Sequence, residues 1–180
     1  SDSKPVTNTS KKELAKIPQS GVVVDKRTNT GYYYNENGKS GSFPVLTGYN
    51  QDSNDGSASM DEKEYNRNAR VTPRGGYLVE TPDINDSDIS QRTLADGSSY
   101  EGYLQRHYKG QMRDITPIEL EGMSKPNVKD LALHRVYSDN SENPNDPEYL
   151  RRMNVLSGSN VKKKCTSYGC INLAEDDYTM

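Results

Sequence analysis

The chain has 180 residues, a net charge of −3 and a sequence pI near 5.5, with 31% hydrophobic residues, no Trp, one Phe and thirteen Tyr. This length suits one domain, and the tyrosines supply rings that can be buried while their hydroxyls stay solvated. Lysine and arginine gather nowhere beyond residues 162–164, which disfavours a nucleic-acid binder, and no apolar run approaches the roughly 18 residues of a transmembrane helix.

The first 19 residues differ in character from the rest of the chain. Residues 1–19 are polar, and residues 10–13 have the spacing of a helix capping box, so a short helix is expected there. Pro18 ends this helix because proline cannot continue it. The folded domain is expected over residues 20–180.

The next part of the chain predicts short strands. Strands are expected at 22–24, 32–34 and 43–46, because β-branched and aromatic runs alternate there with turns that contain Asn and Gly. Residues 49–69 are polar, lack periodicity and predict a long loop. A turn that feeds a further strand is expected over residues 70–79.

The second half mixes strands with a few short helices. Residues 100–108 fit either a strand or a helix, and Thr116, followed by a proline, is expected to start a helix. A strand is predicted at 131–136, and a helix is predicted to begin at Asp146. The sequence therefore predicts a mainly β domain with a few short helices.

Candidate chemistry concentrates near the end of the chain. Cys170 follows a Ser-x-Gly turn, and His134 lies 36 positions upstream within an apolar strand. A free thiol with a pKa near 8.5 is only slightly ionised at pH 7, so a nucleophilic cysteine needs a base such as imidazole. Gly169 permits a tight turn beside a substrate carbonyl. The residues alone equally allow Cys170 to be a small buried hydrophobe and His134 a hydrogen-bonded core histidine.

Four segments of the chain resemble motifs of the L,D-transpeptidase (YkuD) family, in the family's order. Its motif Ser/Thr-His-Gly-Cys, followed by an apolar residue and Asn or Arg, is similar to residues 167–172. Its upstream Ile-His-Gly-like strand is similar to residues 133–135. Its strand ending in Ser/Thr-Gly is similar to residues 42–48, and its Thr-Pro-x-Gly-x-Tyr turn to residues 70–77. The resemblance covers the chain from about residue 20 to its end.

The resemblance implies a YkuD-like β-sandwich and a cysteine acyltransferase that acts on peptidoglycan stem peptides. Cys170 would attack the carbonyl of the third residue of a tetrapeptide stem, release D-Ala and pass the acyl group to an amine, which makes a 3→3 cross-link. His134 would activate the thiol, the main-chain carbonyl of Arg135 would orient the imidazole, and Ser167 would brace the turn or the imidazole. Oxyanion N–H groups would come from Tyr168, Gly169 and Cys170.

The resemblance also implies where this chemistry takes place. The location would be periplasmic or cell-wall-facing, carbapenems would acylate the thiol, and no metal or organic cofactor is implied. Three features depart from the family pattern. Only ten residues follow Cys170, whereas family members usually continue through another helix and strand. Tyr168 replaces the usual His inside the motif, and the stretch between His134 and Ser167 is longer than usual. The extra length predicts an insertion at 138–163 with a helix at 146–156 that acts as a lid over the cleft.

Several alternatives stay open. Cys165, beside three lysines, competes with Cys170 as the nucleophile or could pair with it in a disulfide that blocks activity. The two cysteines and His134 also have the residue types of a zinc site, although the pattern is weak. His107 is expected at the surface. On the same fold, water as acceptor would give an L,D-carboxypeptidase, and loss of activity would leave a non-catalytic cell-wall-binding protein.

Overall fold

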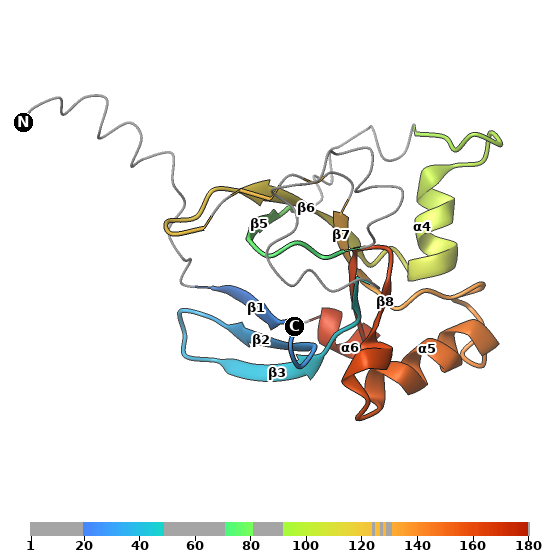
Figure 1. Cartoon of the computed structure of the whole chain (residues 1–180). Coiled ribbons are helices and arrows are strands. Elements are labelled where there is room, and N and C mark those ends of the chain that lie inside the picture. The colour runs from blue at the N-terminus through green and yellow to red at the C-terminus, as the bar shows by residue number, and fades with distance from the viewer. Residues whose placement is uncertain are drawn as a thin grey trace, which may run out of the picture.

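The computed structural model describes residues 20–48, 71–80, 92–123, 125–126, 128 and 131–179. Strands dominate this part of the chain and form three sheets, with the short helices packed around them (Figure 1). The expectation of a mainly β single domain with a few short helices is confirmed. The expected helix within residues 1–19 and the expected loop at 49–69 lie outside the described residues.

The first sheet is the predicted meander of three antiparallel strands, namely β1 (Gly21–Asp25), β2 (Thr30–Tyr34) and β3 (Ser40–Pro44). Asn29, with φ 50°, and Gly38, with φ 80°, supply the left-handed residues of the two turns. Gly31 is required on β2 because a Cβ there would lie 2.6 Å from the ring of Phe43. Phe43 thus packs closely across the sheet and joins the main core.

The second sheet has four strands in the order β5 (Gly76–Val79), β6 (Met112–Ile118), β7 (Leu131–Arg135) and β9 (Ile171–Leu173). β5, β6 and β7 pair antiparallel, whereas β7 and β9 pair parallel. The prediction that a helix starts at Thr116 is wrong, because this residue lies in β6 opposite Leu78. Pro117 fits this strand because it lies beyond residues 112–115, the part of β6 that pairs with the described residues of β7.

The third sheet is a short parallel pair, β4 (Thr47–Gly48) and β8 (Cys165–Ser167). The helical elements are α4 (Tyr100–Tyr108), α5 (Pro147–Ser157), the 3-10 helix η3 (Val161–Lys164) and α6 (Glu175–Tyr178). α4 begins where the Ser99 side chain accepts a hydrogen bond from the N–H of Gly102, which decides between the strand and the helix that the sequence left open. α5 begins as predicted, because the Asp146 carboxylate accepts from the N–H of Tyr149.

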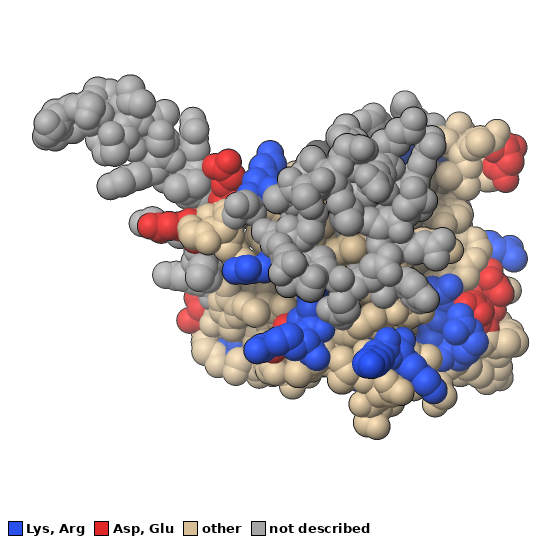
Figure 2. Space-filling model, viewed as in Figure 1, with Lys and Arg blue, Asp and Glu red and all other residues tan. Residues whose placement is uncertain are grey.

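Two apolar clusters hold the sheets and helices together. The main cluster joins the meander to the four-stranded sheet, and its buried members are Phe43, Val45, Val71, Ile115, Val128, Leu131, Ile171 and Leu173. The second cluster consists of Leu46, Val136 and Leu156, and it docks α5 beside the end of β7. On the face shown in Figure 2, the described lysine and arginine side chains form separate groups rather than one continuous basic surface.

Candidate active site

The parallel pairing of β7 and β9 brings Cys170 and His134 to neighbouring strands. Its register places His134 opposite Asn172, and Cys170 immediately precedes β9. Burial is the main cause that raises the pKa of Tyr108. The charge of Tyr103 and its hydrogen bond with Tyr108 raise this pKa further, and the charge of Cys170 adds a smaller effect. The Tyr108 ring in turn lies edge-on to the His134 ring, with 4.7 Å between centroids. The phenol and the imidazole are therefore in contact, and Cys170 comes directly before the strand that pairs with the strand of His134.

His134 is oriented by its own strand. Its Nδ1 lies 2.6 Å from the main-chain oxygen of Arg135. A carbonyl oxygen only accepts hydrogen bonds, so Nδ1 carries the proton and donates, which leaves Nε2 as the basic atom. The side chain is 7% exposed. Burial lowers the pKa of His134 to about 4, assisted by the positive charge of Arg152 and opposed by the bond to Arg135. At neutral pH the imidazole is therefore uncharged and able to accept a proton.

The turn before Cys170 is held by the side chain of Ser167. Its Oγ donates to the main-chain oxygen of Cys170 at 2.6 Å and accepts from the N–H of Gly169 at 3.0 Å. Gly169 has φ 127°, a conformation that favours glycine. The N–H of Gly169 donates to Ser167 in this structure. The oxyanion roles of the N–H groups of Tyr168, Gly169 and Cys170 stay predictions.

Thr72 links this turn to a segment almost 100 residues away in the sequence. Its Oγ1 donates to the main-chain oxygen of Gly169 at 2.6 Å and accepts from the N–H of Gly48 at 2.9 Å. All four segments that carried the family resemblance therefore converge on the site. Thr72 lies within the Thr-Pro-x-Gly-x-Tyr motif, but its sequence predicts no role for it, because only a long-range contact reveals one.

The remaining candidates take other positions. Tyr168 is 75% exposed. Cys165 and Cys170 are both thiols and are not joined by a disulfide bond in this structure. The Sγ of Cys165 accepts from Nδ2 of Asn29 at 3.3 Å, and Oδ1 of Asn29 accepts from Oγ1 of Thr47 at 2.7 Å. Cys165 is thus part of a polar cluster that ties β8 to the meander.

Within the described part of the chain, no group of three His, Cys, Asp or Glu side chains could hold a metal ion, so the zinc alternative is not supported.

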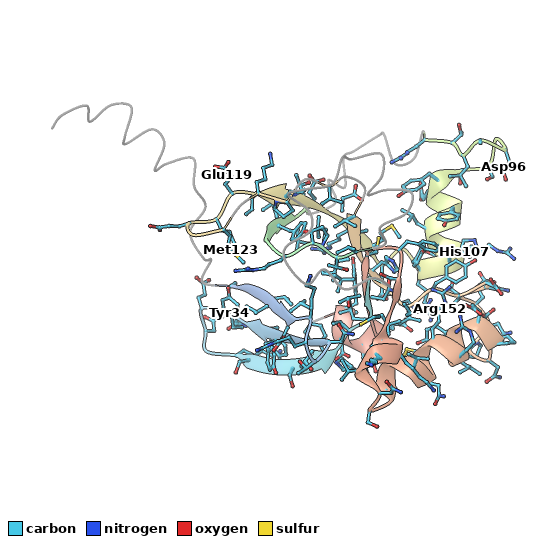
Figure 3. The ribbon with its side chains drawn as sticks, viewed as in Figure 1. Tyr34, Asp96, His107, Glu119, Met123 and Arg152 are labelled. Carbon is cyan, nitrogen blue, oxygen red and sulfur yellow. The ribbon has the colours of Figure 1, made fainter. Side chains whose placement is uncertain are left out.

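His107 is half-buried on α4, not at the surface as expected. Its Nδ1 lies 2.7 Å from the main-chain oxygen of Ser138, and its ring stacks on Tyr137 at 4.9 Å. Arg152 also lies over the Tyr137 ring, at 5.0 Å, and Figure 3 shows His107 and Arg152 on the same side of the domain. The polar neighbours of His107 in the sequence suggested exposure. Aromatic contacts from a distant segment bury it instead.

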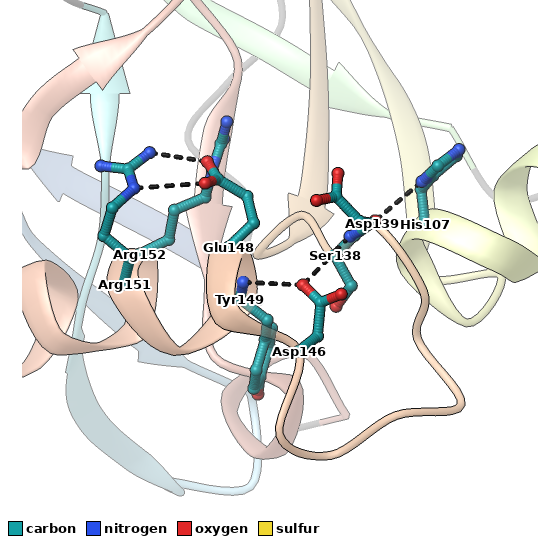
Figure 4. A network of polar contacts seen from close by, with 8 residues as sticks. All are labelled: His107, Ser138, Asp139, Asp146, Glu148, Tyr149, Arg151 and Arg152. Carbon is teal, nitrogen blue, oxygen red and sulfur yellow. Dashed lines mark hydrogen bonds and ion pairs between the residues drawn. The ribbon is translucent and has the colours of Figure 1, made fainter.

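The segment predicted as an insertion is ordered and begins beside His107. Figure 4 shows the Asp146 carboxylate capping α5, and the same carboxylate accepts from the N–H of Asp139 at 3.2 Å. Glu148 pairs with Arg151 at 2.6 Å and Arg152 at 2.8 Å, and these hydrogen bonds lower its pKa to about 2. The lid role of this segment stays a prediction.

Comparison with known proteins assigns the fold. The family model described as the L,D-transpeptidase catalytic domain (YkuD) matches residues 19–179. No curated protein and no solved structure matches the chain. None of the helices in the described residues is both long enough and apolar enough to cross a membrane.

Proposed function

Because this chain belongs to the YkuD family of L,D-transpeptidase catalytic domains, we propose that it is a cysteine acyltransferase that acts on the stem peptides of peptidoglycan. The observation that carries the proposal is the state of His134. Its Nδ1–H is held by the carbonyl of Arg135, its ring is buried, and its strand is paired with the strand that follows Cys170. A base with one defined free nitrogen beside a thiol is what acyl transfer by cysteine requires.

In the acylation step, Cys170 Sγ attacks the carbonyl carbon of the third residue of a tetrapeptide stem. Since burial keeps His134 neutral, its Nε2 can take the proton of the Cys170 thiol as the sulfur–carbon bond forms. The N–H groups of Tyr168 and Cys170 stabilise the oxyanion. The tetrahedral intermediate collapses with cleavage of the bond to D-Ala, whose amine takes the proton from His134.

The second step transfers the acyl group from sulfur to an acceptor. A side-chain amine of another stem attacks the thioester, its proton passes to His134, and the sulfur leaves and is reprotonated, which gives the 3→3 cross-link. These steps use only the residues named, and no metal or organic cofactor is proposed. Because the substrate lies outside the cytoplasmic membrane, we place the protein in the periplasm or facing the cell wall. Water in place of the amine gives the alternative L,D-carboxypeptidase.

The first test identifies the nucleophile by intact-protein mass after incubation of the reduced protein with a carbapenem. A covalent adduct is expected on the parent and on Cys165→Ser, and none on Cys170→Ala. Cys165→Ser is the matched control because it keeps a hydrogen-bonding atom for Asn29. A reduced, folded parent without an adduct would overturn the acyltransferase proposal and favour a non-catalytic wall-binding protein.

The second test identifies the acceptor. The protein is incubated with a tetrapeptide stem in water labelled with oxygen-18, with and without an excess of acceptor stem. Cross-linked product together with released D-Ala supports transpeptidation. Labelled tripeptide as the only product, in the presence of excess acceptor, would show that the enzyme is a carboxypeptidase.

A further inference from the structure

The residue whose carbonyl orients His134 also carries a buried cation. Arg135 is the last residue of β7 and is 3% exposed. A buried guanidinium is tolerated only where the surrounding groups compensate for its lost hydration. The position of this side chain is therefore set by the few groups that can partner it.

Those partners come from three separate parts of the chain. The guanidinium carbon lies 4.4 Å from the centre of the Tyr149 ring on α5. Nη1 donates to the Oγ of Ser138 at 3.2 Å, and Nε lies 3.8 Å from a carboxylate oxygen of Glu175 on α6. Among the residues that the structure describes, Nε has no hydrogen-bond partner, so the ring face of Tyr149 is a principal contact of the cation. Figure 4 shows Tyr149 in the first turn of α5, next to Asp146, the residue that caps this helix.

The backbone of Arg135 transmits this arrangement to the site. The N–H of Arg135 donates to the main-chain oxygen of Gln111 at 3.0 Å, and the N–H of Val136 donates to that of Leu173 at 3.0 Å. The bond from Val136 holds the peptide group between residues 135 and 136, and the oxygen of that group accepts from Nδ1 of His134 at 2.6 Å. The Arg135 side chain and this carbonyl are attached to the same Cα, so the position of the side chain can affect the orientation of the group that holds the imidazole.

We propose that Arg135 is a positioning residue for His134, and that the inserted segment 138–163 keeps it in place through the ring of Tyr149. The proposal rests on the function proposed above and adds a structural role for the insertion. α5 then stabilises the position of the catalytic base His134 through the contact of Tyr149 with Arg135. α5 is docked on the domain by Leu156, so its packing affects the activity of Cys170 through the side chain of Arg135.

The test measures the limiting rate constant of carbapenem acylation in the full chain carrying Cys165→Ser, so that one cysteine is followed. Tyr149→Leu removes the ring face, and Tyr149→Phe retains it. Arg151→Met is the matched control, because it removes an arginine from the same helix that pairs only with Glu148 among the described contacts. The final adduct stoichiometry and the melting temperature are recorded for each variant.

Tyr149→Leu is expected to lower the limiting rate roughly 10-fold, and Arg135→Met on the order of 100-fold, because small misplacements of a catalytic group have effects of this size. The carbapenem concentration at half-saturation and the final stoichiometry should not change. Tyr149→Phe and Arg151→Met should stay within about 2-fold of the parent. A purely structural role would instead lower the stoichiometry or the melting temperature and leave the rate of folded molecules intact.

Two failures are distinguishable. If the parent acylates fully and Tyr149→Leu acylates at the parent rate, the positioning role is wrong while the proposed function stands. If the parent with its single Cys170 gains no adduct, the proposed function is wrong, and the positioning role is wrong with it. Should Arg135→Met fail to fold, the comparison of Tyr149→Leu with Tyr149→Phe still decides the question.

Discussion

Acidification is expected to destabilise this domain through His134. Burial lowers the pKa of His134 to about 4 in the folded chain, whereas a histidine in an unfolded chain titrates near 6.5. As the pH falls, the unfolded state binds the proton first, so the free energy of unfolding falls between about pH 6.5 and 4 and levels off below that. At about 1.4 kcal/mol for each pKa unit, the loss is about 2 kcal/mol at pH 5 and about 3 kcal/mol at pH 4.

The assay compares urea unfolding of the parent and of His134→Gln at pH 7, 6, 5 and 4.5. Glutamine can still donate to the carbonyl of Arg135 but does not titrate. The parent should lose about 2 kcal/mol more than the variant between pH 7 and pH 5. Other groups, such as Glu148 with its pKa of about 2, contribute equally to both proteins and cancel in the difference. A difference that stays constant with pH would refute the buried neutral imidazole, and with it the order of proton transfer proposed for acylation.

Three further substitutions test the turn and the docked helix. Ser167→Ala removes the hydroxyl that bonds to the N–H of Gly169 and to the main-chain oxygen of Cys170, so the free energy of unfolding should fall by about 1–3 kcal/mol. Carbapenem acylation should also become slower, and Ser167→Thr should restore its rate. Gly169→Ala introduces strain at φ 127° that should cost about 1–3 kcal/mol and should abolish acylation while the circular dichroism spectrum is retained. Leu156→Ala empties a fully buried position against Val136 and should cost about 2–5 kcal/mol in urea unfolding. Losses under about 0.5 kcal/mol would mean that these contacts do not hold the site.

Local patterns predicted the elements that depend on local interactions. The meander follows from turn residues at Asn29 and Gly38, and α5 begins at Asp146 because a carboxylate can cap a helix that starts with proline. The same local rules failed at Thr116. A threonine followed by a proline also suits the end of a strand, where residues 116–118 of β6 pair with β5 beyond the stretch that pairs with β7, and these pairings are not visible in the sequence.

Motif resemblance predicts the residues of the site but not the contacts that support them. It pointed to His134 and Cys170 as a pair, whereas the edge-on contact of Tyr108 with the imidazole and the bond from Thr72 to Gly169 come from distant segments. His107 shows the limit most clearly. Its sequence neighbours are polar, yet its ring is covered by Tyr137.

The sequence by itself determined which side chains can do chemistry here, because a thiol after a Ser-x-Gly turn and a histidine in an apolar strand are local features. Only the tertiary structure decided how they act. The parallel pairing of β7 with β9 places His134 near Cys170, and burial rather than residue type sets the protonation state of the imidazole. The carbonyl of Arg135 selects its tautomer. Burial and strand pairing depend on residues that lie far apart in the sequence, so no local sequence pattern predicts them.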